Sequence, residues 1–553
     1  MTDGDRGRWR TIAAVTATVL AGLLVFIALV APNDINGLTP AAFVRLPLEA
    51  LVGIAFLLAL PARARTVAAV LGGVALGLLT VVKVLDMGFL SVLARPFDPV
   101  LDWVLLDDAY NFVAESSGTT AAIGAAIGAV LLVVAILVLI MLATLRLTRL
   151  AVRRQDAASR AVAAGTVVWL ACAVLGAQIV PGVPVASRSA AGILYNRAQL
   201  VGVGLHDQQA FAAEASVDAF RDTPPDQLLT ALRGKDVVFT FVESYGRVAL
   251  EDPALAPGVG AVLDDGNRRL QAAGFSSRSA FLTSPVAGGG SWLAHATFFS
   301  GLSIDNEQRH RNLVSGDRLT LSSAFHSANW STVAVMPGTT RAWPEAGFFG
   351  YDRVHDAFGL GYHGPSFSWA TTPDQYTLDA FQRLERSTPN RAPVMAEIPL
   401  VSSHAPWSPT PQLVGWDELG DGSIFASMSG EGAPPSAIWT RDPTLVRSEY
   451  GQSIEYSLSS VISYLEKYGD DNLVFVFLGD HQPAPVVTGA AASRDVPITI
   501  VTRDRAVLDR IAGWGWQDGL RPSPQAPVWP MDSFRDRFLT AYGSQPTSTP
   551  AQH

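Results

Sequence analysis

The stretch VVFTFVESYGR, residues Val237–Arg247, decides the fold of the larger part of this chain. Its first six residues are mostly β-branched or aromatic, which predicts a short buried strand. Glu243 comes where that strand ends, and a Ser-Tyr-Gly turn follows it. In open α/β sheets, ligands bind beyond the carboxyl ends of the strands. Glu243 is therefore a candidate metal ligand or catalytic group; the alternative is a carboxylate that only caps the following turn.

The composition predicts a membrane part joined to a soluble part. The chain has 553 residues, of which 49% are hydrophobic and only 16% are charged, an unusual balance for a soluble enzyme. The net charge of −9 gives no reason to expect nucleic-acid binding. Cys172 is the only cysteine, so the chain can form neither an intrachain disulfide nor a cysteine metal cluster.

The N-terminal third predicts an all-α transmembrane domain of five helices, residues 1–181. Five apolar segments are long enough to cross about 30 Å of hydrocarbon; they are roughly residues 11–31, 42–60, 66–85, 120–145 and 161–181. Arginines gather before the first segment, between the second and third, and between the fourth and fifth. The positive-inside rule then places the N-terminus in the cytoplasm and everything after Pro181 outside.

Beyond the membrane domain the sequence predicts three parts. Residues 182–235 read as a juxtamembrane connector that is mostly helical. Residues 236–542 alternate strand and helix patterns, which predicts an extracellular α/β domain with a mostly parallel central sheet and helices on both faces. The tail, 543–553, is rich in Ser, Thr, Pro and Gln, which predicts disorder.

A second stretch is built like the first. The apolar run LVFVFL, residues 473–478, is followed by Gly-Asp-His-Gln-Pro, so that Asp480 and His481 come directly after a buried strand. A lone Asp-His pair is usually a surface turn, but this pair matches the layout around Glu243. Two carboxylates and one imidazole suit Mn²⁺, Mg²⁺ or Zn²⁺.

A glycine triplet introduces a candidate nucleophile. Residues 288–290 are all glycine, and Ser291 follows at the start of a predicted helix. Free N–H groups at a helix N-terminus suit a tetrahedral anion, and coordination to a metal would make the serine a nucleophile. The alternative is that Ser291 is only the helix N-cap. His295, one turn later, either reaches the same site or packs beside the helix.

Three further residues are candidates for substrate binding. His404 follows the predicted strand 394–401 and could bind a phosphoryl oxygen or act as general acid to a leaving alkoxide. Arg341 could pair with phosphate and Trp343 could stack on a head group. For Arg341 and for Trp343, the alternative is a structural role.

Together these motifs resemble the sulfatase and alkaline phosphatase superfamily, and within it the membrane-bound branch of lipoteichoic acid synthases and phosphoethanolamine transferases. The resemblance covers about residues 236–542. It implies one divalent metal, with Mn²⁺ expected first and Mg²⁺ or Zn²⁺ as alternatives. The matching positions are Glu243, Asp480 and His481 as metal ligands, Ser291 as metal-bound nucleophile and His404 as substrate-binding histidine.

The chain departs from the family pattern in places. The nucleophile of that branch is typically threonine, whereas here it is serine, and Arg341 precedes Trp343 where lipoteichoic acid synthases have the reverse order. The string Ser-Thr-Pro-Asn-Arg at 387–391 fits the motif in which sulfatases make formylglycine. It lies between a helix and a strand, and we interpret it as a helix-ending turn.

The sequence thus predicts a metal-dependent phosphotransferase in a bacterial plasma membrane. The donor would be a membrane phospholipid head group of the phosphoglycerol type, and the acceptor a cell-envelope glycan or lipid. A phospho-Ser291 intermediate would link the two steps. Two alternatives stay open: a membrane-anchored sulfatase or phosphoesterase that transfers to water, and a non-catalytic envelope protein. The segment 406–447, rich in Gly, Ser and Pro, could cover the site or be an exposed loop.

Overall fold

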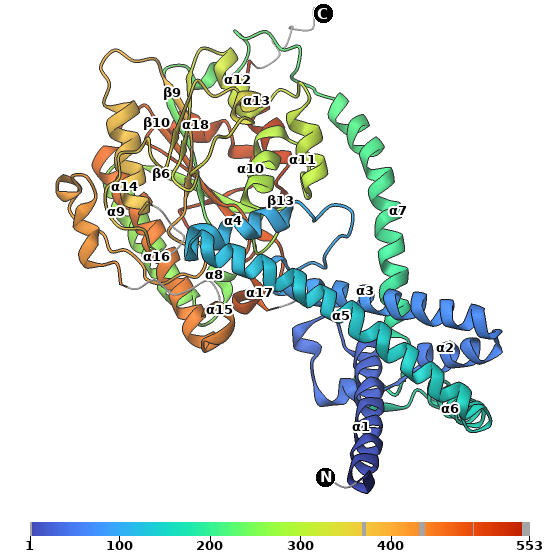
Figure 1. Ribbon diagram of the computed structural model, residues 1–553. Helices are drawn as coiled ribbons and strands as arrows, with labels where there is room; N and C mark the ends of the chain where they lie inside the picture. Colours follow the sequence, from blue (N-terminus) through green and yellow to red (C-terminus); the bar gives the residue numbers. More distant parts are fainter. Residues whose placement is uncertain (1–2, 368–371, 431–436, 490–491, 545–553) are drawn as a thin grey trace, which may run out of the picture. The chain divides into compact units, whose positions relative to one another are not determined.

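The chain folds into two compact units, one helical and one α/β (Figure 1). The computed structural model describes residues 3–367, 372–430, 437–489 and 492–544. Residues 545–553 of the predicted disordered tail, and 431–436 of the segment 406–447, lie outside that part. The main boundary between the units falls at His206/Asp207, inside helix α7 (Ser189–Ser216) and so inside the predicted connector.

Within the described residues, four helices of the first unit are long and apolar enough to cross a membrane. They are α1 (Asp3–Val30), α3 (Ala62–Leu93), α5 (Thr119–Arg153) and α6 (Gln155–Leu175). The predicted segment 42–60 contains α2 (Leu48–Ala59), a helix of 12 residues, which rises only about 18 Å. The count of five spans therefore stays a prediction.

Two glycines let α3 and α5 pack closely and fix their relative direction. A Cβ at Gly73 would lie 2.8 Å from the Met141 Cα, and one at Gly77 would lie 2.9 Å from a Leu137 methyl. Small residues at such contacts allow helix backbones to approach each other in a membrane. Because the higher-numbered glycine meets the lower-numbered partner, the helices are antiparallel, and α3 begins where α5 ends.

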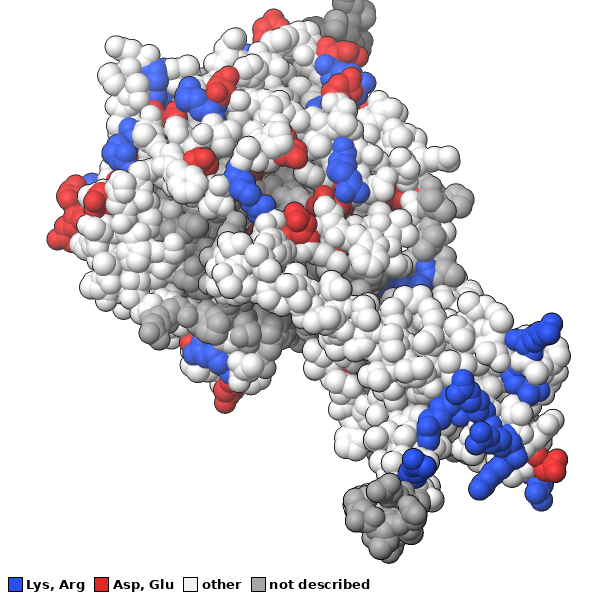
Figure 2. Space-filling model, viewed as in Figure 1, with Lys and Arg blue, Asp and Glu red and all other residues white. Residues whose placement is uncertain are grey.

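The three arginine groups of the helical unit consequently share one end. Arg146, near the end of α5, donates to the Ala14 carbonyl at 2.6 Å and to Thr18 Oγ1 at 3.0 Å, both near the start of α1. Arg63 and Arg65 begin α3 and so lie at this end too. Figure 2 shows Lys and Arg gathered at one end of this unit, next to a largely uncharged surface. The positive-inside prediction requires this arrangement; the orientation itself stays a prediction.

The α/β unit is built on one sheet, which contains nine strands within the described residues, in the order β12-β6-β11-β10-β5-β9-β7-β8 with β13 beside β6. The central strands β10, β5, β9, β7 and β8 run parallel, whereas β11 is antiparallel to both its neighbours. The strands are β5 (Asp236–Val242), β6 (Ser276–Thr283), β7 (Ser331–Met336), β8 (Arg353–Asp356), β9 (Val394–Leu400), β10 (Leu473–Gly479), β11 (Asp495–Thr502), β12 (Gln517–Asp518) and β13 (Val528–Pro530).

Helices cover both faces of this sheet (Figure 1), as the sequence predicts. Along β5, Val238 and Val242 point into one core and Phe239 and Phe241 into the other, because successive side chains alternate in a strand. The fold class, a helical unit followed by an α/β unit with a mostly parallel sheet, is therefore confirmed. The first core is covered by α9 (Ala256–Ala272), α14 (Asp374–Phe381) and α16 (Pro443–Tyr468), and the second by α10 (Ser291–Ser300), α12 (Leu321–Ser327) and α19 (Ser533–Tyr542).

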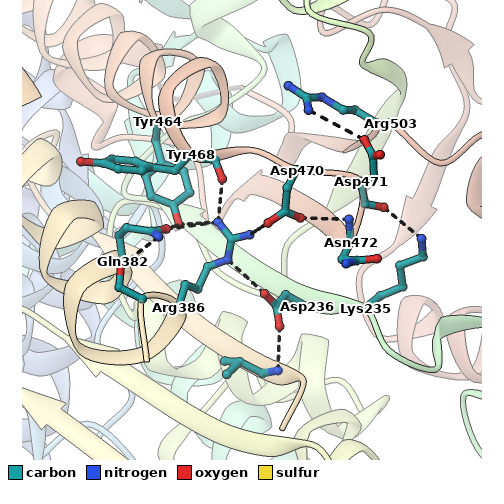
Figure 3. A network of polar contacts seen from close by, with 12 residues as sticks. Lys235, Asp236, Gln382, Arg386, Tyr464, Tyr468, Asp470, Asp471, Asn472 and Arg503 are labelled. Carbon is teal, nitrogen blue, oxygen red and sulfur yellow. Dashed lines mark hydrogen bonds and ion pairs between the residues drawn. The ribbon is translucent and has the colours of Figure 1, made fainter. Parts of the chain in front are cut away.

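A buried ion network closes the N-terminal end of β5 (Figure 3). The Arg386 guanidinium donates to Asp236 at 3.1 Å and to Asp470 at 2.7 Å, and Arg391 also pairs with Asp236. Arg391 is the last residue of the string that fits the sulfatase motif. Since β5 has seven residues, this network lies about 23 Å from Glu243, and the string has a structural role at the far end of the sheet.

Replacing Arg386 with methionine is expected to destabilise the α/β unit by about 3 kcal/mol, because it leaves the buried Asp236 with less compensation. Thermal unfolding of the full chain in detergent, followed by intrinsic fluorescence, measures the effect. Arg383→Met is the matched control, since Arg383 is 48% exposed and its ion pair with Asp379 is long, at 3.7 Å; such pairs contribute about 0–1 kcal/mol. Equal melting temperatures for the two variants would contradict a stabilising role for the network.

Candidate metal centre and nucleophile

Four predicted residues converge at the carboxyl ends of β5 and β10. Ser291 Oγ lies 2.9 Å from Glu243 Oε2 and 3.2 Å from His481 Nε2. The same His481 nitrogen lies 3.4 Å from Glu243 Oε1 and 3.7 Å from Asp480 Oδ2. Because Val242 and Gly479 are register partners in neighbouring parallel strands, the residues that follow them emerge side by side.

The donor set fits a single divalent cation. Donors held about 2.1 Å from a tetrahedral ion are roughly 3.4 Å from one another, and the distances here run from 2.9 to 3.7 Å. Glu243, Asp480 and His481 are 8%, 1% and 1% exposed, and His481 is their only basic partner among the ion pairs of the described residues. Two buried carboxylates without a compensating cation are costly.

Burial and the charges of neighbouring carboxylates shift the pKa values of Asp480 and His481. Burial, together with the charge of Glu243, raises the pKa of Asp480 to about 6. Burial alone would lower the pKa of His481, but the carboxylates of Asp480 and Glu243 reverse this and raise it. A bound cation would relieve the repulsion between the carboxylates, so these shifts agree with a metal site.

Backbone contacts in the two strand-end loops orient the ligands. Asp480 Oδ1 accepts hydrogen bonds from the N–H groups of Ser244 at 2.8 Å and of His481 at 2.7 Å. Ser244 has a left-handed backbone, with φ of 56°, which is uncommon for residues other than glycine. His481 Nδ1 donates to the Gln482 carbonyl at 2.8 Å, so Nε2 keeps its lone pair for the cluster.

Gln482 connects three loops of the site, and Gly246 leaves room for its side chain. A Cβ at Gly246 would lie 1.8 Å from Gln482 Oε1. The Gln482 carbonyl also accepts a hydrogen bond from the Gly288 N–H at 2.8 Å.

We expect Gly246→Ala to displace Gln482 and thus His481, and to weaken Mn²⁺ binding about tenfold. Competition with a fluorescent chelator measures this affinity. Gly347→Ala, at a helical position with no heavy atom within 4 Å of the new Cβ, should leave it unchanged; equal affinities for both variants would contradict this role.

Ser291 is presented by the glycine triplet and does not act as the N-cap. Gly288, Gly289 and Gly290 have φ values of 74°, 159° and 86°, a range that L-residues with side chains rarely adopt. Gly290 is the N-cap of α10 and Ser291 is the first helical residue. The serine side chain contacts Glu243 and His481, so the structure shows the serine directed at two of the predicted metal ligands.

His404 lies in the loop after β9, the other neighbour of β5. Ser403 Oγ donates to the Glu243 carbonyl at 2.6 Å, which connects this loop to the predicted metal ligand. His404 Nδ1 donates to the Ala405 carbonyl at 2.7 Å. Burial, with a smaller contribution from His481, lowers the pKa of His404 to about 4, so the imidazole is neutral at pH 7. Its role in substrate binding or acid catalysis stays a prediction.

The other two predicted substrate residues lie in the loop after β7. Arg341 is exposed. The Trp343 ring is half-buried and lies 5.9 Å, centroid to centroid, from both Phe349 and Tyr351. Those contacts give Trp343 a packing role, and the head-group contacts of both residues stay predictions.

Three hydrogen-bonded side chains, those of His295, Glu397 and Tyr351, lie one helical turn from Ser291, and the sequence predicts only part of this set. His295 Nδ1 lies 2.8 Å from Glu397 Oε1, and the Tyr351 hydroxyl donates to Glu397 Oε2. His295 is predicted either to reach the site or to pack, and Glu397 is absent from the predicted set. The available signal was a lone carboxylate inside the apolar strand sequence VMAEIPL, since an unpaired charge is seldom buried in a strand.

Among the comparisons with known proteins, the one with solved structures finds matches. No protein-family model matches this sequence, and a search of curated proteins finds no match. The chain is similar to several solved structures. The lipoteichoic acid synthase LtaP from Listeria monocytogenes is 14% identical, with a TM-score of 0.38, over 61% of this chain and 80% of that one. The Streptococcus pyogenes phosphoglycerol transferase GacH, in complex with sn-glycerol-1-phosphate, is 13% identical, with a TM-score of 0.35, over 60% and 92%. The C-terminal periplasmic domain of EcEptC from Escherichia coli is 13% identical, with a TM-score of 0.32, over 50% and 74%.

Proposed function

We propose that this chain is a metal-dependent phosphotransferase of a bacterial cell envelope. It would move a phosphoglycerol-type head group from a membrane phospholipid to a glycan or lipid acceptor. One observation carries the proposal: the Ser291 hydroxyl, at the N-terminus of α10, lies among Glu243, Asp480 and His481. A nucleophile, a cation site and a helix N-terminus together suit a phosphate diester.

The resident group is a divalent cation held by Glu243, Asp480, His481 and Ser291, with Mn²⁺ expected first. When bound, it supplies positive charge that lowers the pKa of the Ser291 hydroxyl and stabilises charge on the phosphoryl group. The amino-acid residues supply the remaining functions, which are orientation of the hydroxyl and movement of protons.

In the first step, Ser291 Oγ attacks phosphorus and the bond between phosphorus and the lipid alcohol oxygen breaks. The Ser291 hydroxyl proton leaves to solvent, because Glu243, which accepts the Ser291 hydrogen bond at 2.9 Å, is a ligand of the cation and stays a carboxylate. His404 gives a proton to the departing oxygen, which leaves as diacylglycerol. Since His404 is neutral at pH 7 without ligand, it takes up this proton as the negative phosphate binds, because a nearby anion raises its pKa.

In the second step, an acceptor hydroxyl attacks the phosphorus of phospho-Ser291 and the bond from phosphorus to Oγ breaks. His404, neutral after the first step, takes the proton of the acceptor hydroxyl. Ser291 Oγ takes a proton back from solvent. The acceptor carries the phosphoglycerol group, and when it leaves, His404 releases to solvent the proton that it took up on substrate binding.

The proposal is tested with the full chain in detergent, Mn²⁺ and phosphatidylglycerol labelled in its head group. We expect diacylglycerol release, label on the peptide that contains Ser291, and loss of both when EDTA is added. Absence of label from the protein, together with absence of released diacylglycerol, would contradict the proposal for this lipid. Supplying glycan or lipid acceptors then separates transfer from hydrolysis, since a hydrolase would deliver the label only to water.

A further inference from the structure

His295 lies next to the candidate metal site, one helical turn after Ser291. Ser291 and His295 are four residues apart in α10, so they lie on one face of the helix about 6 Å apart. Glu243, the first residue after β5, is two residues from Phe241 and continues the face of the strand on which Phe241 lies. Ser291 Oγ contacts Glu243 at 2.9 Å, and the His295 ring stacks on Phe241 with centroids 3.8 Å apart. The contact of His295 with Phe241 is therefore adjacent to the contact of Ser291 with Glu243, between the same helix and the same strand.

The sheet order determines where the two ring nitrogens point. Nδ1 faces Glu397 Oε1 at 2.8 Å, and Glu397 lies on β9, opposite Phe239 and so below the level of Phe241. Strand β5 lies between β9 and β10. The two nitrogens of an imidazole point in widely divergent directions. Since Nδ1 points toward Glu397, Nε2 points toward the carboxyl ends of the strands and toward β10. Asp480, the residue after β10, lies on that side.

The Nε2 atom is buried and, among the described residues, has no hydrogen-bond partner. The Glu397 carboxylate accepts from both Nδ1 of His295 and the Tyr351 hydroxyl, so the proton of a neutral ring sits on Nδ1 and Nε2 presents a lone pair. A buried lone pair without a donor is costly. A histidine backed by a carboxylate is the arrangement that supports metal sites.

His295 lies outside the set whose donor atoms are mutually within 4.8 Å, which consists of Glu243, Asp480 and His481. We propose that His295 is a positioning residue of the metal centre: its Nε2 accepts a hydrogen bond from a water molecule held in the cluster, and Glu397 and Tyr351 hold the ring in place. This inference rests on the proposed metal site and extends the machinery from the four ligands to a second imidazole. The loop after β7 joins this assembly through the contact of Trp343 with Tyr351.

Mn²⁺ binding to the full chain in detergent, without lipid, tests the proposal. His295→Phe keeps the stack on Phe241 and removes both nitrogens; we expect its Mn²⁺ Kd to rise about tenfold. His295→Gln offers an amide acceptor and should stay within about threefold of wild type. The matched control is His355→Phe, since His355 makes a similar pair with Glu385 at 2.7 Å at the strand β8, and it should bind Mn²⁺ as wild type does. The melting temperature without metal reports folding separately.

A Kd for His295→Phe within twofold of wild type would overturn the proposal, and so would a loss for His295→Gln as large as that for His295→Phe. If His295→Phe does not fold, Glu397→Gln decides: a Kd raised threefold or more supports the role, and an unchanged Kd refutes it. Failure of the proposed reaction can be distinguished from failure of the proposed role of His295. A wild-type chain that binds Mn²⁺ but releases no diacylglycerol ends that reaction and leaves the His295 test intact, whereas a wild-type chain that binds no Mn²⁺ refutes both.

Discussion

Asparagine in place of Asp480 is expected to lower the Mn²⁺ affinity by at least about 100-fold while the protein stays folded. Loss of an outer partner of a metal site already costs 10–100-fold, and Asp480 is proposed as a direct ligand. The amide oxygen can still accept the hydrogen bonds that Asp480 Oδ1 receives from Ser244 and His481. The loops should therefore keep their conformation while the charge is lost.

The same variant should have an opposite effect on the metal-free protein. Burial and Glu243 raise the pKa of Asp480, which means that its charged form is disfavoured in the fold. A neutral amide removes this repulsion, so the melting temperature of the metal-free variant should equal or exceed that of wild type. Mn²⁺ at 100 times its Kd should stabilise wild type by about 2.7 kcal/mol and the variant hardly at all.

Differential scanning fluorimetry with and without Mn²⁺ measures both effects. Asp518→Asn is the matched control, because the Asp518 side chain is 83% exposed in its pair with Arg278, and its response to Mn²⁺ should equal that of wild type. If Mn²⁺ stabilises Asp480→Asn as much as wild type, Asp480 is not a ligand and the metal assignment fails.

The sequence predicts the centre of the fold well because that centre is apolar on both faces. Strands β5 and β10 read as continuous hydrophobic runs, and both are fully buried, as parallel strands covered by helices are. The short edge strands β12 and β13 carry no such signal, with two and three residues. The antiparallel direction of β11 is set by the connection between β10 and β11. The pattern of residues within β11 carries no information on this direction, so the sequence could not predict it.

The site is predictable where a ligand directly follows a strand. Glu243 and Asp480 obey this rule, and register between β5 and β10 brings them together. Gln482 and Glu397 escape it for different reasons. Gln482 acts partly through its backbone carbonyl, which any residue carries, and its side chain fits against a glycine that is distant in sequence. Glu397 lies in the middle of β9, where its purpose depends on a histidine about 100 residues earlier.

Alanine in place of Ser291 is expected to lower the rate of diacylglycerol release by a factor on the order of 10⁴ or more, and to remove the label from the protein. Loss of a nucleophile in a concerted site has effects of this size. Threonine keeps the hydroxyl, and its branched Cβ is tolerated at the first residue of α10, so Ser291→Thr should stay within about tenfold of wild type.

The Mn²⁺ affinity separates the two roles of this serine. Ser291 Oγ lies 2.9 Å from Glu243 and 3.2 Å from His481, at one corner of the cluster, while three ligands remain in Ser291→Ala. We therefore expect a moderate loss of Mn²⁺ affinity, about tenfold, that saturating Mn²⁺ overcomes without restoring the reaction. Recovery of diacylglycerol release by Ser291→Ala at saturating Mn²⁺ would show that the serine serves only the metal, and that water or another hydroxyl attacks phosphorus directly.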